Sequence, residues 1–288
     1  MIYHLYRIAY TRVRFVIGAR RETWRARLRE KPMTQLDIAQ IPCLNDNYGY
    51  LLHDAASGET ACIDTPEPGP ILAELERRNW QLSHIWNTHH HWDHAGNNLE
   101  IKQATGCRII GPAGEADKIP GIDEAVDDGD TISFGGHAVQ IFNVGGHTLG
   151  HIAYYLPDAG LAFVGDSLFA LGCGRVFEGT MAQMWASLEK LAGLPDGTLI
   201  YCAHEYTAAN AAFAATIDPD NAALQARIAD ITALRSQNKP TVPTEIGLER
   251  ATNPFLRAAD PAIRARLNMA HAENVDVFAE IRSRKDNF

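Results

Sequence analysis

The sequence predicts an α/β protein in which two β-sheets pack face to face with helices on the outside, followed by a region built from helices. Between residues 36 and 204, short apolar runs bounded by turn residues alternate with a few helical stretches. Two strand-rich halves interrupted by helices favour two packed sheets. The segment 206–237 is rich in alanine and has helical periodicity. We therefore expect a change from sheets to helices near residue 205.

The expected strands are short apolar runs that end at turn or polar residues. They cover residues 48–53, 60–64, 82–87, 107–110, 138–143, 151–156, 161–164 and 199–202. The expected helices are longer stretches with apolar residues three and four apart. They cover residues 68–79, 93–105 and 181–194, and then 206–237, 261–270 and 275–284, with a loop around 240–243.

Composition limits the classes of function. The 288 residues carry a formal net charge of −9, which argues against bulk binding of nucleic acid, because such binding needs a basic surface. No apolar run approaches the roughly 18 to 20 residues of a membrane span. The five cysteines are an odd number without CxxC spacing, so neither a disulfide framework nor a thiolate zinc site is expected. We expect a cytoplasmic monomer with a small-molecule substrate and no membrane or nucleic-acid partner.

Residues 1–32 differ from the rest of the chain in composition. They contain nine Lys and Arg residues and two acidic residues. Three interpretations are open: a basic leader, a surface or partner helix, and an upstream extension created by a misplaced start codon. We expect a poorly packed extension without a catalytic role.

Residues 88–94 read THHHWDH and place four histidines and one aspartate within six positions, directly after an expected strand. Alternate side chains of an extended chain point the same way, so His89 and His91 can converge on one point. The chain then turns into a helix, where Asp93 and His94 can face a second point nearby. Imidazole and carboxylate groups are suitable ligands for divalent metals such as zinc.

Three further candidate ligands follow apolar runs farther along the chain. His147 lies in GGHTLGH, Asp166 in VGDS and His204 in CAHEY. Each precedes a break in the pattern, which suits side chains gathered along one rim of a sandwich. Glycines beside His147 and Asp166 would allow the backbone to approach a crowded site closely. His90 alternates away from the candidate ligands on either side of it, so we do not count it.

Taken together, these motifs resemble those of the metallo-β-lactamase superfamily, in the same order along the chain. The resemblance covers about residues 33–288 and implies an αββα sandwich with metals at its rim, followed by a C-terminal helical domain. Eight residues match functional positions of the family. The implied ligands of the first metal are His89, His91 and His147, those of the second are Asp93, His94 and His204, Asp166 bridges the two metals, and Asp64 orients a ligand histidine.

Seven ligands without a thiolate suit two divalent metals held about 3.5 to 4 Å apart. Zinc is the first expectation, and iron or manganese would also fit. A water bridging two such cations would lose its proton easily, and the resulting hydroxide could attack an activated acyl group. The residues expected to support this catalysis are Asp93, Asp166, His89 and His91, and no separate protein nucleophile is needed.

Other motifs resemble hydroxyacylglutathione hydrolases, also called glyoxalase II, rather than the superfamily at large. They are PCLNDNY at 42–48, GCGRVFEGT at 172–180, NPFLR at 253–257 and RSRKDNF at 282–288. This resemblance implies hydrolysis of S-D-lactoylglutathione to glutathione and D-lactate, the second step of methylglyoxal detoxification. It also implies a catalytic domain at 33–205 and a helical glutathione-binding domain at 206–288.

Five positions match the glutathione-binding residues of that family, namely Arg175, Phe177, Tyr206, Arg282 and Lys285. Arginine and lysine are natural partners for the two carboxylates of glutathione. Arg282 and Lys285 are three apart and would share one face of a helix. On spacing alone, they could instead complement the end of that helix. Where some family members have Tyr and Lys, this chain has Phe177 and Arg175, and the phenylalanine lacks a hydroxyl donor.

Other functions on the same fold remain open. They include another thioester or lactone hydrolase and a mononuclear iron persulfide dioxygenase, which would need only the first metal. A β-lactamase is less favoured, because a secreted enzyme would show an export signal. A non-catalytic zinc-binding or partner-binding module would explain the ligands, but not the matching basic residues at the C-terminus.

Overall fold

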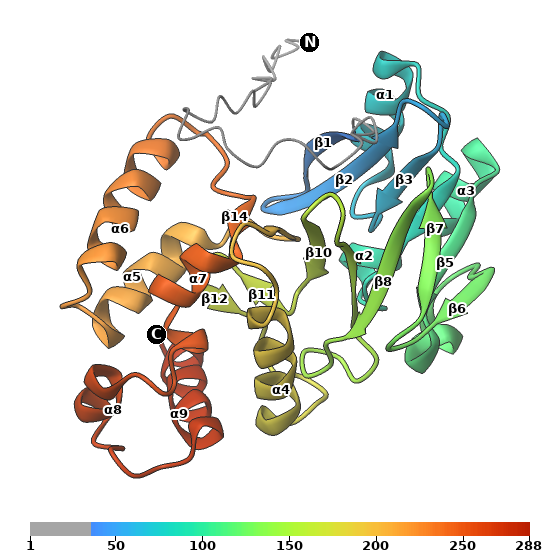
Figure 1. The fold of residues 1–288 in the computed structure, drawn as a ribbon. Helices are drawn as coiled ribbons and strands as arrows, with labels where there is room; N and C mark the ends of the chain where they lie inside the picture. Colours follow the sequence, from blue (N-terminus) through green and yellow to red (C-terminus); the bar gives the residue numbers. More distant parts are fainter. Residues whose placement is uncertain (1–35) are drawn as a thin grey trace, which may run out of the picture. The chain divides into compact units, whose positions relative to one another are not determined.

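The computed structural model describes residues 36–288, so the basic extension expected at residues 1–32 lies outside the described residues. The described part is built around two six-stranded sheets (Figure 1). The strand order is β1-β2-β3-β4-β5-β6 in the first sheet and β14-β13-β10-β9-β8-β7 in the second. This arrangement confirms the predicted pair of sheets.

The first sheet combines antiparallel and parallel pairs. Strands β1 to β3 are antiparallel, and β3 to β6 are parallel. Its strands are β1 (Leu36–Cys43), β2 (Asn47–Asp54), β3 (Thr60–Ile63), β4 (His84–Trp86), β5 (Arg108–Pro112) and β6 (Glu124–Val126). Parallel neighbours need a crossover connection. The crossovers contain α1 (Pro68–Arg78), α2 (Trp92–Ala95), α3 (Asn98–Thr105) and the 3-10 helix η1 (Ala113–Lys118).

The second sheet is antiparallel except where β10 pairs with β13. Its strands are β7 (Thr131–Phe134), β8 (His137–Asn143), β9 (Ile152–Leu156), β10 (Leu161–Gly165), β13 (Leu199–Cys202) and β14 (Thr244–Glu245). The crossover from β10 to β13 contains the hairpin of β11 (Leu168–Phe169) and β12 (Gly172–Cys173), and helix α4 (Met181–Ala192). A capping box starts α4, because the side chains of Thr180 and Gln183 each accept a hydrogen bond from the other residue's backbone N–H.

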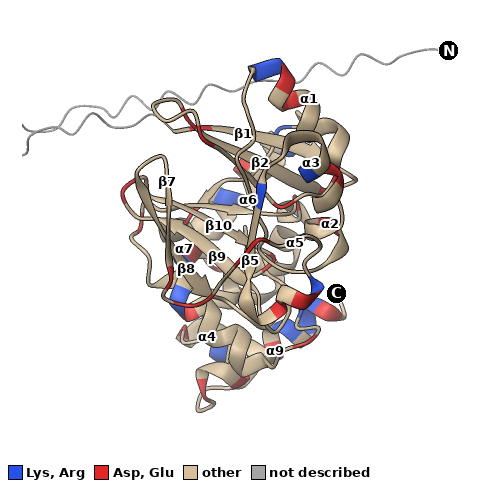
Figure 2. Cartoon of the chain, turned by 90° about the vertical axis from the view of Figure 1, so that its right-hand side faces the viewer, with Lys and Arg blue, Asp and Glu red and all other residues tan. Residues whose placement is uncertain are grey.

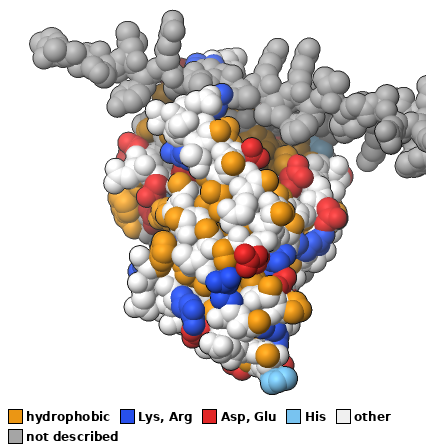
Figure 3. Space-filling model, turned by 90° about the vertical axis from the view of Figure 1, so that its left-hand side faces the viewer, with side chains coloured by type: hydrophobic (Ala, Val, Ile, Leu, Met, Phe, Trp, Pro, Cys, Tyr) orange, Lys and Arg blue, Asp and Glu red, His pale blue; other side chains and the backbone are white. Residues whose placement is uncertain are grey.

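Helices dominate the chain after β13, as predicted. They are α5 (Thr207–Ile217), α6 (Ala222–Arg235), α7 (Ile246–Thr252), the 3-10 helix η2 (Pro254–Leu256), α8 (Pro261–Leu267) and α9 (Asn274–Asp286). Figure 3 shows the side of the molecule on which α5 and α6 lie, where apolar side chains are exposed among charged ones. In the described residues, no helix combines the length and apolarity needed to cross a membrane.

The main core lies between the two sheets. Trp86 of β4 stacks on Tyr154 of β9 with ring centroids 5.1 Å apart. Tyr50 of β2 contacts Phe163 of β10 at 5.8 Å. These aromatic pairs join one sheet directly to the other, which fixes the ends of their strands relative to one another.

Strand β2 is buried on both faces. Tyr50 and Leu52 belong to the core between the sheets, whereas Leu51 belongs to a second cluster that includes Ile71 of α1. Successive side chains of a strand point to opposite faces, so this alternation places the sheet between two apolar layers. It explains why this strand reads as an apolar run without polar alternation.

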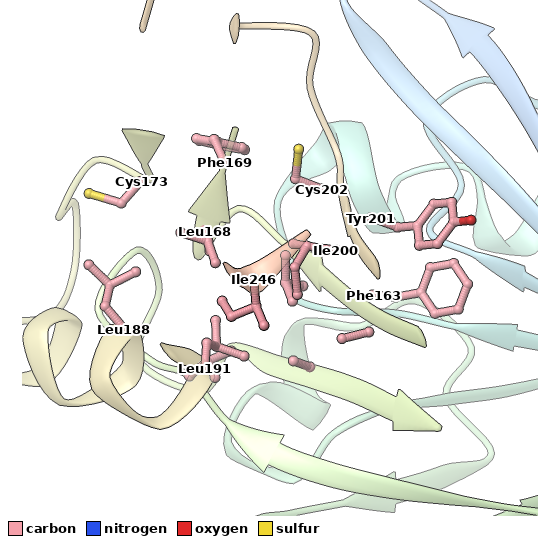
Figure 4. Packing of buried hydrophobic residues seen from close by; sticks show 14 of the residues in the cluster. Phe163, Leu168, Phe169, Cys173, Leu188, Leu191, Ile200, Tyr201, Cys202 and Ile246 are labelled. Carbon is pink, nitrogen blue, oxygen red and sulfur yellow. The ribbon is translucent and has the colours of Figure 1, made fainter. Parts of the chain in front are cut away.

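Helix α4 packs against the second sheet from outside. Leu191 lies close to Ile246 of α7 (Figure 4), and Leu188 belongs to the same buried cluster as Ile200 of β13. The two leucines are spaced three apart on α4, so they share one helical face. The packing anchors the crossover that leads from β10 to β13.

The prediction of one helix over 93–105 is wrong, because the structure has two. The break falls at Gly96 and Asn97, between α2 and α3. The side-chain amide of Asn97 donates to the carbonyl oxygens of Thr65 and Pro66. Local bonding of this kind competes with helix continuation.

The stretch with helical periodicity over 206–237 forms two helices. Helix α5 ends at Ile217 and α6 begins at Ala222. Pro219 lies in the break and cannot donate a helical hydrogen bond. Asn221 then caps α6 by accepting from the backbone N–H of Leu224.

Strand β1 was not predicted. It contains Pro42, which disfavours a strand in sequence analysis because proline has no N–H to donate. The structure tolerates this residue because β1 is an edge strand of the first sheet. The short strands β6, β7, β11, β12 and β14 and helix α7 were also not predicted.

Candidate metal centre

Loops that follow strand ends meet at one edge of the sandwich. The chain after β4 carries residues 87–91 into α2, the loop between β8 and β9 carries His147, and Asp166 and His204 closely follow β10 and β13. The structure brings all seven predicted ligands together there. The ligands form three overlapping groups, and within each group the ligand atoms lie within 4.8 Å of one another. The groups are His89, His91 and His147; His89, His94 and Asp166; and Asp93, His94 and His204.

Hydrogen bonds fix the proton positions of two histidines in the first group. His147 Nδ1 lies 2.8 Å from the carbonyl oxygen of Arg175, which can only accept, so Nδ1 carries the proton. Thr88 donates its hydroxyl to Asp64 and therefore accepts from His89 Nδ1 at 3.1 Å. A neutral imidazole has one N–H, so both rings turn a bare Nε2 toward the centre of the site.

Carboxylates hold two histidines of the other groups. Asp64 Oδ2 lies 2.8 Å from His94 Nδ1, and Asp46 Oδ1 lies 2.8 Å from His204 Nδ1. Partners of this kind fix ring orientation and tautomer, and they raise the basicity of the nitrogen that faces a metal. Asp64 thus contacts one of the predicted ligands, His94.

Ring nitrogens and carboxylate oxygens of the ligands face one another across the site. His91 Nδ1 lies 3.1 Å from His89 Nε2 and 3.0 Å from His147 Nε2. The buried atoms His94 Nε2 and Asp166 Oδ1 have no hydrogen-bond partner within the described part of the chain. Burying unpaired nitrogen and carboxylate atoms is costly unless a cation lies among them. The residues therefore fit a binuclear metal site.

Asp166 reaches both sides of the cluster. Its carboxylate oxygens lie 3.4 Å from His147 Nε2 and 3.3 Å from His204 Nε2. Burial alone would raise its pKa, yet the pKa of Asp166 lies well below its usual value because His204 faces the carboxylate. Gly165 precedes it with a φ of +48°, and a Cβ there would lie 2.5 Å from the hydroxyl of Thr88. Glycine is therefore needed for this close approach.

Sequence reasoning missed the metal-centre role of the PCLNDNY motif. Asp46 holds His204, and Asn47 donates its side-chain amide to Asp93 at 3.0 Å. The sequence analysis uses this motif only as a sign of the substrate. The available signal was two neighbouring polar side chains at the start of β2, where a strand end meets the rim.

His90 also has a partner that the sequence did not reveal. Its Nδ1 lies 2.8 Å from the buried Glu115, which also accepts from the backbone N–H of His90. Its Nε2 lies 3.2 Å from Glu178. His90, His91 and Glu178 form a fourth group of possible ligands, but His91 turns its Nδ1 to the main cluster.

His151 is the last histidine of the GGHTLGH segment, and the sequence analysis gave it no role. Its side chain is fully buried. Burial, together with the neighbouring His147, lowers the pKa of His151 to about 3. His151 belongs to none of the possible ligand groups found in residues 36–288.

Two aromatic residues predicted to bind glutathione lie beside the ligands. Phe177 is 62% exposed, and its ring centroid is 5.2 Å from that of His147. Tyr206 stacks on His204 with centroids 4.7 Å apart. An exposed aromatic surface next to the ligand cluster can hold the apolar part of a substrate close to the reacting centre.

The predicted basic residues gather near the end of α9, where Figure 2 shows ribbon segments of Lys and Arg in blue close to the C-terminus. Arg175 Nε lies 3.5 Å from Asp286. The ammonium group of Lys285 donates to the carbonyl of Ala209 at 3.2 Å. Partial burial lowers the pKa of Lys285, and Arg282 and Arg175 nearby lower it further.

Arg282 differs from the other four, because it is only 4% exposed. Its guanidinium donates to the carbonyl oxygen of Cys173 at 2.9 Å and to Asp286 at 2.9 Å. A bond to a substrate carboxylate would have to replace or share the one to Asp286. Arg282 therefore also ties α9 to the β11–β12 hairpin.

Two family models cover most of the described chain. Residues 50–204 match the metallo-beta-lactamase superfamily, and residues 205–288 match the hydroxyacylglutathione hydrolase C-terminus. The hydroxyacylglutathione hydrolase of Hyphomonas neptunium is 59% identical over 254 residues, which cover 88% of this chain and 98% of the relative. That of Maricaulis maris is 57% identical over 256 residues, which cover 89% of this chain and 100% of the relative.

A solved structure agrees with the fold. ETHE1 from Myxococcus xanthus superposes with a TM-score of 0.62 at 24% identity, covering 86% of this chain and 90% of that one. At this identity the likeness concerns the fold alone. High identity to the two hydrolases over nearly their whole length, together with both family models, identifies the family within this fold. The chain belongs to the hydroxyacylglutathione hydrolase family of the metallo-β-lactamase superfamily.

Proposed function

We propose that the protein hydrolyses S-(2-hydroxyacyl)glutathione thioesters, and S-D-lactoylglutathione in particular, to glutathione and D-lactate. One observation carries this proposal: a ligand set for two metals shares one edge of the fold with exposed aromatic and basic side chains. Relatives named for this activity are 57% and 59% identical. They do not favour a lactone hydrolase, a persulfide dioxygenase or a non-catalytic module.

The ligand assignment is the one implied by the sequence. His89, His91 and His147 would hold one ion, Asp93, His94 and His204 the other, and Asp166 both. Two divalent cations bound there would lower the pKa of a water molecule and polarise the thioester carbonyl. Zinc is the expected metal, and the same nitrogen and oxygen donors accept iron or manganese.

The remaining residues orient ligands and substrate. Asp64 and Asp46 accept from the Nδ1 atoms of His94 and His204, which would leave the Nε2 atoms to bind the metal. Holding the thioester in one orientation beside the metals converts a bimolecular reaction into an effectively intramolecular one.

Glutathione would bind along the surface between the ligand cluster and α9. Arg175, Arg282 and Lys285 would supply the positive charge for its carboxylates, with Arg282 also bonded to the carbonyl of Cys173. Phe177 and Tyr206 flank the ligands and would contact the chain that leads to the sulfur.

We also propose the domain organisation that the sequence implies. Residues 33–205 would form the catalytic domain and residues 206–288 the helical domain that binds glutathione. All seven metal ligands come from one chain, so a monomer could carry a complete site. Residues 1–32 would take no part in catalysis, and deleting them is expected to leave kcat/KM within about twofold.

The test is hydrolysis of S-D-lactoylglutathione by the purified full chain, before and after chelation, with metal content measured on the same sample. We expect hydrolysis that is lost on chelation and restored by added zinc, with about two metals per chain. A protein that binds two metals but turns over only lactones or non-glutathione thioesters would refute the substrate. Full activity without metal would refute the ligand assignment.

A further inference from the structure

His151 lies directly behind the metal ligands without being one of them. It is fully buried, and its ring is stacked on that of His89 with centroids 4.5 Å apart and an interplanar angle of 19°. It also contacts the residue that precedes Asp166, because a Cβ added to Gly165 would lie 2.8 Å from the His151 ring. The His151 side chain therefore contacts the predicted ligand His89 and the residue next to the predicted ligand Asp166.

The hydrogen bonds of His151 define its tautomer. The backbone N–H of Asp166 points at His151 Nε2 at 3.0 Å. A backbone N–H can only donate, so Nε2 must be the acceptor and Nδ1 must carry the proton. Nδ1 lies 3.4 Å from the hydroxyl oxygen of Ser167, which in turn donates to the carbonyl of Val144 at 3.0 Å. Every polar atom of the ring therefore has a partner.

This network controls where the Asp166 carboxylate can lie. Asp166 follows the last residue of β10, and its side chain must reach both halves of the ligand cluster. His151 accepts a hydrogen bond from the backbone N–H of Asp166. This bond limits the directions in which the Asp166 side chain can point. The stacked ring limits rotation of His89 at the same time.

We infer that His151 is a positioning residue of the metal centre: as a neutral imidazole with Nδ1 protonated, it fixes Asp166 through its backbone N–H and His89 through ring stacking. This role rests on the proposed metal centre and adds a residue to it. It predicts that the acceptor atom, and not only the volume of the ring, determines metal affinity.

The experiment compares His151→Phe with His151→Gln in the full chain. Phenylalanine keeps an aromatic ring beside His89 but leaves the N–H of Asp166 without an acceptor. Glutamine can place an amide oxygen near the position of Nε2 and an N–H near Ser167. Metal-free protein is titrated with zinc against a chromophoric chelator, and its melting temperature is measured without metal.

We expect His151→Phe to weaken binding of at least one zinc ion by about 10- to 100-fold, the usual loss when an outer partner of a metal site is removed. His151→Gln should recover most of that affinity. The control is His137→Phe, which alters a buried histidine that pairs with Asp158 at the opposite end of β8 from the site. It should lower the melting temperature and leave zinc affinity unchanged.

Two results would overturn the inference. One is wild-type zinc affinity in His151→Phe, and the other is a His151→Gln protein that binds zinc no better than His151→Phe. If His151→Phe fails to fold, Ser167→Ala replaces it, because it removes the hydroxyl that holds the tautomer. It should weaken zinc binding in the same direction by a smaller factor, and unchanged affinity would overturn the inference. Because no substrate is used, absence of thioester hydrolysis would refute the proposed function separately.

Discussion

His147 Nδ1 and the carbonyl oxygen of Arg175 are 2.8 Å apart, so a proposed metal ligand is hydrogen-bonded to the backbone of a residue proposed to bind glutathione. The two residues are 28 positions apart in the chain. The same loop carries Phe177, whose ring lies against His147. Substrate contacts and metal geometry are therefore coupled through one loop.

The first prediction concerns Gly174, which lies beside this bond. A Cβ at this position would overlap the carbonyl oxygen of Asp166 and lie 3.2 Å from His147 Nδ1. Gly174→Ala should therefore displace both ligands, lowering metal content and kcat. Gly197→Ala is the control, because a Cβ there meets no atom within 4 Å. Equal metal content and kcat in the two variants would contradict the coupling.

A second prediction compares the two carboxylates that hold ligand histidines. Asp64 is buried and bonds to His94 and to the backbone N–H of Thr88, whereas Asp46 is partly exposed and bonds to His204. Asp64→Ala should weaken metal binding by about 10- to 100-fold, and Asp46→Ala should have a smaller effect. Chelator competition measures both, and a larger loss in Asp46→Ala would reverse the expected order.

The third prediction concerns glutathione recognition. Lys285→Ala should raise KM for S-D-lactoylglutathione much more than it lowers kcat, because it removes binding that is equal in ground and transition states. Arg284→Ala is a matched control on the same helix, since Arg284 pairs with Glu280 on the surface. Steady-state kinetics distinguish them. An unchanged KM in Lys285→Ala would remove this residue from the proposed glutathione site.

Arg282 should behave differently from Lys285. Its guanidinium ties α9 to the carbonyl of Cys173, so Arg282→Ala should lower the melting temperature as well as raise KM. The same substitution at Lys285 should leave the melting temperature nearly unchanged. Thermal unfolding recorded beside the kinetics separates the two roles, and a higher KM without any loss of stability would make Arg282 a binding residue only.

A final prediction concerns the buried ion pair of Arg227 with Glu249. Glu249 is fully buried and also accepts from the backbone N–H of Leu171 beside the β11–β12 hairpin. Arg227→Ala leaves this carboxylate uncompensated and should lower the free energy of unfolding by about 3 to 5 kcal/mol. Arg266→Ala breaks an exposed pair with Asp220 and should cost at most about 1 kcal/mol. Urea unfolding of the metal-loaded proteins measures both.

Much of the fold could be predicted because its signals are local. The strands of the two sheets are apolar runs, and α1 and α4 show clear helical patterns. Breaks inside helices were harder to predict, since they depend on contacts of single side chains, those of Asn97 and Asn221. Strand β1 escaped prediction because Pro42 is acceptable only at a sheet edge, and an edge is a property of the assembled sheet.

The sequence by itself determined which residues could be metal ligands, because imidazoles and carboxylates directly after apolar strands have few other uses at such density. The family resemblance supplied their division into two groups. Tertiary structure alone decided which atoms face the metals. Asp46 and His204 are 158 positions apart, and Asp64 and His94 are 30 apart, so these pairs exist only after the sheets have packed. Proton positions depend on such partners, and so does the role of His151, which no spacing in the chain could show.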